Sequence, residues 1–105
     1  MRRIRSRLAQ LADELERARQ AEHVLADQVE HLTEVADDAE TRKLTAETPL
    51  AERAWREART DLDRHAGSLE DTRRLIADLR TEQDALLDQL VEQTARAGGG
   101  TQRDR

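Results

Sequence analysis

His23, Asp27 and His31 have the spacing in this chain that comes closest to a metal site. They recur every four residues, so on a helix their imidazole and carboxylate groups would lie along one face. No further strong ligand and no outer layer of hydrogen-bonding partners accompanies them in the sequence. We therefore interpret them as three solvated side chains, and we expect the protein to use no metal and no cofactor.

Groups that could carry out catalysis are few. The chain has no cysteine, and its serines are Ser6 and Ser68. It has no Gly-rich phosphate loop, and no pair of carboxylates falls where a cleft is expected. We expect that the protein is not an enzyme, so its remaining polar residues must be understood from the elements that position them.

Apolar residues in the first half of the chain recur at alternating steps of four and three. Ten of eleven such positions are apolar, and the exception is Glu22. A strand would alternate every two residues, and an ordinary surface helix would drift out of a seven-residue repeat. The repeat therefore predicts a coiled-coil helix over about residues 3–44. Its seam comprises Ile4, Leu8, Leu11, Leu15, Ala18, Glu22, Leu25, Val29, Leu32, Ala36 and Ala39.

The second half of the chain repeats this pattern from Ala51, with nine of twelve positions apolar. It predicts a second coiled-coil helix over about residues 49–97. This seam comprises Ala51, Trp55, Ala58, Leu62, His65, Leu69, Thr72, Ile76, Leu79, Gln83, Leu86 and Leu90.

A turn is predicted at residues 45–48. Pro49 would cost about 3 kcal/mol inside a helix, but it fits the first position of a helix whose N-cap is Thr48. The predicted fold is all-α: a single domain over residues 1–97 that forms a long antiparallel helical hairpin, a two-helix coiled coil.

A run of three glycines follows the second predicted helix. We expect Gly98, Gly99 and Gly100 to stop that helix, and residues 98–105 to form a disordered Gly-rich tail.

Two registers are possible for the hairpin. When the numbers of paired residues sum to 94, all eleven seam positions of the first helix have a partner, and the largest side chain faces one of the smallest. A slip of one heptad, to a sum of 87, places Glu22 against His65 but leaves Leu86 and Leu90 without partners. We prefer the sum of 94, because close packing requires complementary sizes.

Four polar residues occupy seam positions. Glu22 faces Thr72 in the preferred register, and we interpret this pair as a polar layer that fixes the register at some expense of stability. The alternative is a site for a partner or a pH sensor, since His65 lies two layers away and histidine is the residue type whose charge can change near neutral pH. Gln83 completes this set.

Several positions beside the seam are also apolar or small. They widen the apolar stripe beyond that of a two-helix coiled coil, as in helices that belong to a larger bundle. We expect a homodimer that forms a four-helix bundle, or docking on a protein partner whose identity the sequence does not indicate. The candidate association face comprises Ala12, Ala21, Ala26, Val35, Leu75, Leu87 and Val91.

Charge is uneven along the chain. The basic end comprises Arg2, Arg3, Arg5 and Arg7. The helix dipole disfavours cations there, and in the preferred register these residues lie beside Asp84, Asp88 and Glu92. We therefore expect ion pairs within the chain, with binding to nucleic acid, an anionic membrane or an acidic partner as the alternative.

The half of the chain nearer the turn is acidic, because residues 22–72 hold 14 acidic and 6 basic residues. The net charge is −5, and no aromatic residue accompanies the short basic end. We do not expect nucleic acid to be the main ligand.

The chain has no run of more than three apolar residues, whereas a signal-peptide core needs about 7 and a membrane span about 20. We expect no membrane span and a cytoplasmic location. The basic residues are 17 arginines and one lysine, which favours a bacterium of high GC content as the source.

These observations favour a non-enzymatic protein-interaction module, a scaffold, adaptor or assembly factor. It would act through self-association and through contacts made by the helix faces or by the acidic tip, which is the end of the hairpin at the turn. One alternative is a transcription regulator of the coiled-coil anti-sigma type, since some anti-sigma factors are antiparallel coiled coils.

Another alternative is a secreted helical hairpin or a type VII secretion partner. With Trp55 near the predicted turn, the chain resembles in length and helix-turn-helix plan the small Trp-x-Gly proteins of type VII secretion. Its motif reads Trp55-Arg56-Glu57, without the glycine, and it has no tyrosine for their C-terminal export signal.

Overall fold

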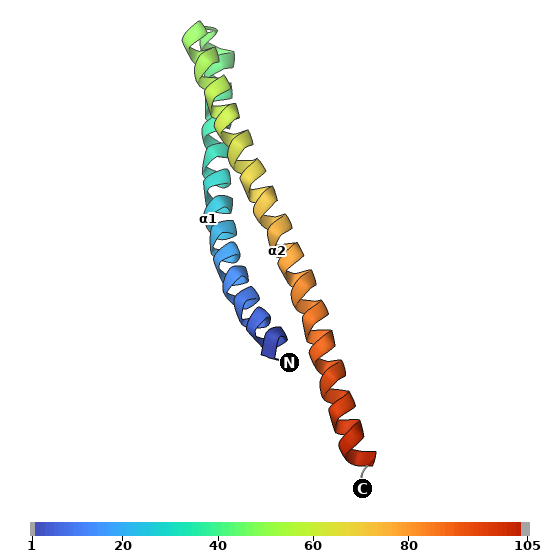
Figure 1. Ribbon diagram of the computed structural model, residues 1–105. Helices are drawn as coiled ribbons and strands as arrows, with labels where there is room; N and C mark the ends of the chain where they lie inside the picture. The colour runs from blue at the N-terminus through green and yellow to red at the C-terminus, as the bar shows by residue number, and fades with distance from the viewer. Residues whose placement is uncertain (1, 104–105) are drawn as a thin grey trace. The chain divides into compact units, whose positions relative to one another are not determined.

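Two long helices form the described part of this protein. The computed structural model describes residues 2–103, and the side chains of residues 2–98. Helix α1 spans Arg2–Ala46 and helix α2 spans Pro49–Arg103 (Figure 1). No strand occurs among residues 2–103. The prediction of an all-α antiparallel helical hairpin is confirmed.

Glu47 and Thr48 connect the helices. The Ala51 N–H donates to the Thr48 side-chain oxygen at 3.2 Å, so Thr48 is the N-cap of α2 and Pro49 its first residue, as predicted. Glu47 has a φ of 51°, in the left-handed region, and its N–H donates to the Lys43 carbonyl at 3.2 Å. This conformation ends α1 two residues later than the predicted boundary.

The predicted stop of the second helix at the three glycines is wrong. Helix α2 continues through Gly98 and ends at Arg103. A glycine ends a helix when it takes a positive φ, and no glycine in the described part of the chain does so. With helical φ and ψ a glycine costs only about 1 kcal/mol relative to alanine. The predicted disordered tail therefore fails for residues 98–103, and residues 104–105 lie outside the described range.

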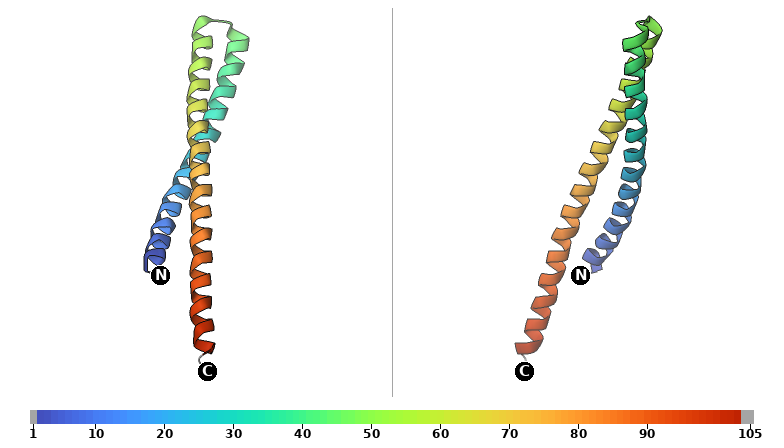
Figure 2. Two further views of the ribbon diagram at one scale, coloured as in Figure 1. Left: turned by 45° about the vertical axis from the view of Figure 1, so that its right-hand side comes forward. Right: turned by 180° about the vertical axis from the view of Figure 1, so that it is seen from behind.

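The chain divides into two compact units. The end unit combines Met1–Arg19 with Leu75–Arg105, and the turn unit is Gln20–Arg74. Each unit contains one stretch of α1 and one stretch of α2. Figure 2 shows from two sides how the teal-to-green stretch of α1 runs alongside the green-to-yellow stretch of α2 in the turn unit.

The predicted seam is the core of both units. Every seam position is buried or partly buried, and most other side chains are exposed. The end-unit cluster contains Leu11, Leu15, Ala18, Ile76 and Leu79, with Leu86 packed against it. The turn-unit cluster contains Ala36, Ala39 and Ala58, with Trp55 and Leu62 packed against it.

The composition of these clusters agrees with the preferred register. In the end unit, Leu15 and Leu79 belong to one cluster, and their numbers sum to 94. In the turn unit, Trp55 packs against the cluster that contains Ala39, which gives the same sum.

We expect Gly67→Ala to raise the free energy of unfolding by about 1 kcal/mol, and the melting temperature by about 4 °C or more. Gly67 lies inside α2 without positive φ, and a Cβ built there would meet no atom within 4 Å. Thermal unfolding followed by circular dichroism measures the effect. The neighbouring exposed Ala66 supplies the matched control, since Ala66→Gly should lower stability by a similar amount. A loss of stability in Gly67→Ala would contradict the expectation.

Candidate interaction surfaces

The four polar seam residues are all partly buried. Glu22 does not bind Thr72; its carboxylate accepts a hydrogen bond from the Arg73 Nε at 3.2 Å across the turn unit. The Thr72 hydroxyl instead donates to the Ser68 carbonyl of its own helix at 2.9 Å. The layer is therefore joined across the helices by an ion pair from Arg73, a residue that the seam pattern did not single out.

Two of the three histidines, His65 and His23, contact groups of their own helix. The His65 Nδ1 lies 2.8 Å from the Asp61 carbonyl oxygen, one turn earlier in α2. His23 and Asp27 form an exposed pair at 3.7 Å. Within the described residues no group of three His, Cys, Asp or Glu side chains is placed to hold a metal ion.

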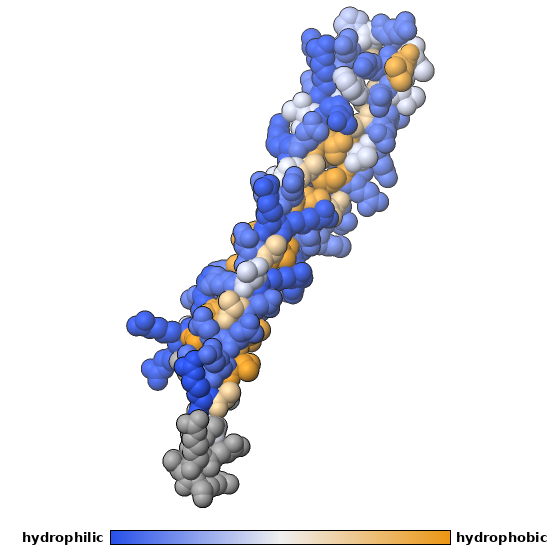
Figure 3. Space-filling model, turned by 90° about the vertical axis from the view of Figure 1, so that its right-hand side faces the viewer, coloured by the Kyte–Doolittle hydropathy of each residue, from blue (hydrophilic) through white to orange (hydrophobic). Residues whose placement is uncertain are grey.

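Most residues of the candidate association face are exposed, although Ala26 is partly buried. The large members Val35, Leu75, Leu87 and Val91 retain 40 to 67% of their accessible surface. Figure 3 shows hydrophobic side chains along the helices, flanked by hydrophilic ones. The structure thus leaves large apolar side chains outside the filled seam.

Leu75 has the best-defined surroundings of these residues. It lines a surface hollow of the end unit together with Leu79, Ala18, Arg17 and Glu14. The surface that lines this hollow is mainly apolar, and one acidic and one basic residue contribute to it. Of the predicted face, Ala21, Ala26 and Val35 belong to the turn unit, and the other four residues belong to the end unit.

Two exposed leucines near the turn were missed by the sequence reasoning. Leu44 is 67% exposed and Leu50 is 75% exposed. Leu50 borders a hollow whose other lining residues are mostly alanine and threonine. Both leucines lie off the seam on either side of Pro49, so a search for apolar residues outside the seam would have found them.

The lone tryptophan is covered by the lone lysine. The Lys43 ammonium lies 3.7 Å from the centroid of the Trp55 ring, within the distance of a cation–π interaction. Trp55 also packs against the turn-unit cluster, which contains Ala39, its predicted partner.

At the basic end, Arg7 is held by an ion pair that the sequence did not identify. Its Nε and Nη2 donate to the two carboxylate oxygens of Glu82 at 2.6 and 2.8 Å, and its Nη1 donates to Glu14 at 3.4 Å. The bidentate hydrogen bonds raise the pKa of Arg7 above its ordinary value and lower the pKa of Glu82.

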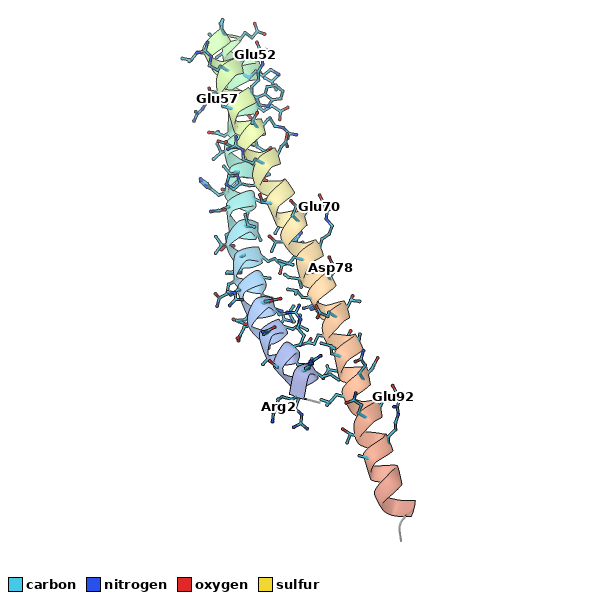
Figure 4. All side chains as sticks on the ribbon, in the orientation of Figure 1. Arg2, Glu52, Glu57, Glu70, Asp78 and Glu92 are labelled. Atoms are coloured by element: carbon cyan, nitrogen blue, oxygen red, sulfur yellow. The ribbon has the colours of Figure 1, made fainter. Side chains whose placement is uncertain are left out.

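The predicted ion pairs of the basic end with Asp84, Asp88 and Glu92 do not form. Those three carboxylates are exposed, on the side of α2 away from the seam, whereas Glu82 is beside it. Glu92 instead binds Arg96 of its own helix. In the described part of the chain the other three arginines of the basic end form no ion pair, and Figure 4 shows Arg2 at the first turn of α1.

No helix within residues 2–103 has an apolar stretch long enough to cross a bilayer. The chain matches no protein-family model, and no curated protein or solved structure is detectably similar to it.

Proposed function

We propose that this protein is a non-enzymatic coiled-coil interaction module, a scaffold, adaptor or assembly factor that works by self-association. The observation that carries the proposal is the exposure of Leu75, at 49%, over an apolar hollow although the seam beneath is already filled. Burial of apolar surface contributes about 25 cal/mol per Å². A second hairpin laid on this side would cover Leu75 and produce a four-helix bundle.

The polar side chains support a non-catalytic role. Within the described residues no polar or charged side chain is buried. The shifted pKa values of Arg7 and Glu82 arise from their own hydrogen bonds rather than from a cleft. A surface whose polar side chains are all at least partly exposed can dock another helix, but it does not shield a substrate from water.

Sedimentation equilibrium at micromolar concentration tests the proposal. We expect the wild-type chain to be a dimer. Leu75→Glu should weaken association at least about tenfold, because it would bury an unpaired carboxylate in the interface. Leu50→Glu is the matched control, since Leu50 is more exposed but lies outside the candidate association face. A wild-type monomer with a cooperative thermal transition would contradict the proposal.

A further inference from the structure

Helix α1 carries a long acidic stretch without any basic residue. Between Arg19 and Arg42 there are seven acidic residues and no lysine or arginine. Three of the seven have partners: Glu22 binds Arg73, Asp27 lies near His23, and Asp38 binds Arg42. Negative charge is therefore concentrated in this stretch of α1, and within the described residues only Glu22 of the seven acids is paired with a residue of α2.

Three of the remaining acids form one exposed stripe, here called the carboxylate face: Glu30, Glu34 and Asp37. Each is exposed and forms no ion pair within the described residues. Their spacing of four and three residues places them on one side of α1 over about 10 Å. Like charges at this spacing repel each other by a few tenths of a kcal/mol per pair. An external cationic group would relieve this repulsion.

A group of basic residues without ion-pair partners in the described part of the chain occurs at the start of the same helix. Arg2, Arg3 and Arg5, here called the arginine end, are exposed and form no ion pair within the described residues. The first turn of α1 contains no acidic residue. The unpaired N–H groups of a helix N-terminus are themselves positive, so the three arginines add to an existing positive potential. An external anionic group is favoured here.

We propose that the arginine end of one copy of this chain docks on the carboxylate face of a second copy. Three guanidinium groups meet three carboxylates, so each of the two surfaces neutralises the excess charge of the other. Two copies supply both surfaces in equal number, which an unrelated partner need not do. The inference rests on the proposed self-association, to which it adds a charged contact between the copies.

Such a contact is mainly electrostatic and therefore responds to salt. The Debye length falls from about 10 Å at 0.1 M salt to about 3 Å at 1 M. We expect the dissociation constant of the assembly to rise about tenfold as NaCl increases from about 50 mM to about 500 mM. Apolar association alone would not weaken in this way, because salt does not screen apolar burial.

Exchange of the charges provides the decisive experiment. One variant carries Arg2→Glu with Arg5→Glu, and the other carries Glu30→Lys with Glu34→Lys. By itself, each variant presents like charges at the contact, so its association should weaken about tenfold in sedimentation equilibrium at low salt. A mixture of the two restores opposite charges at both types of contact, and its association should return to near the wild-type value.

Neither variant should fail to fold. Acidic residues in the first turn of a helix are favourable, and lysines at 30 and 34 can pair with Asp27 and Asp37. Circular dichroism checks this. Arg53→Glu with Arg64→Glu and Glu57→Lys with Glu70→Lys are controls that change the net charge equally on other exposed positions; Figure 4 labels Glu57 and Glu70 on α2.

The outcomes separate this inference from the proposed function. Association that is unaffected by salt and by both charge-exchange variants would overturn the docking contact while leaving self-association in place. Failure of the mixture to recover would also overturn it, since it would show that each surface meets a different partner. A wild-type chain that stays monomeric at low salt would overturn the proposed self-association itself.

Discussion

Leu11→Ala is expected to lower the free energy of unfolding by about 3 kcal/mol, the largest effect of any single truncation in the chain. Leu11 is fully buried at 0% exposure and belongs to the end-unit cluster with Leu15, Ala18, Ile76 and Leu79. Its neighbours are held on two helices and can close only part of the resulting cavity. The urea midpoint should therefore fall by about 1–2 M.

Two probes on the same samples show how far this effect spreads. Circular dichroism reports on both helices, whereas the fluorescence of Trp55 reports on the turn unit. Because α1 and α2 each continue through both units, we expect both probes to shift together in Leu11→Ala. Leu50→Ala is the control: Leu50 is 75% exposed, so its truncation should change stability by less than about 0.5 kcal/mol. A Trp55 transition that stays in place would contradict the expected cooperativity.

The helices and their seam could be predicted because the determining signals are local and repeated. A strict heptad pattern indicates which side of each helix is buried, and the buried positions of the structure are those of the pattern. Pro49 restricts the backbone so strongly that the start of α2 follows from the sequence, with Thr48 as its cap. Pairing of large with small side chains, such as Trp55 with Ala39, was enough to favour one register.

The helix ends were less predictable because they depend on backbone conformations that residue type alone does not determine. Glu47 adopts a positive φ, which glycine or asparagine would have signalled and glutamate does not. Gly98 keeps a helical conformation, so the residue that most often ends a helix does not do so here.

The surface contacts could be predicted only in part, since long charged side chains have several partners within reach. Arg7 lies beside the seam and reaches Glu82, which is also beside it, rather than the carboxylates farther round α2. Arg73 likewise reaches Glu22 from a position next to the predicted partner Thr72. Choosing between such partners requires side-chain rotamers, which the seven-residue repeat does not specify.

Replacement of the polar layer by leucine is expected to stabilise the hairpin while weakening its register. In the variant with Glu22→Leu and Thr72→Leu, two partly buried positions gain apolar surface, and the free energy of unfolding should rise by about 2 kcal/mol. The lost ion pair with Arg73 offsets little of this gain, because both of its side chains are partly exposed and surface pairs contribute at most about 1 kcal/mol.

Disulfide trapping measures the register in two backgrounds: the natural chain, and the leucine background with Glu22→Leu and Thr72→Leu. The natural chain has no cysteine, so any disulfide reports on the introduced pair alone. Leu25→Cys with Leu69→Cys tests the sum of 94, and Leu25→Cys with Leu62→Cys tests the sum of 87. A disulfide needs Cα atoms within about 7 Å, so only the first pair should close in the natural background. In the leucine background the second pair should also close to a measurable extent, because Glu22→Leu removes the ion pair with Arg73 that supports the register of sum 94. Closure of the second pair in the natural background, or a loss of stability on replacing the layer, would show that Glu22 and Thr72 do not select the register.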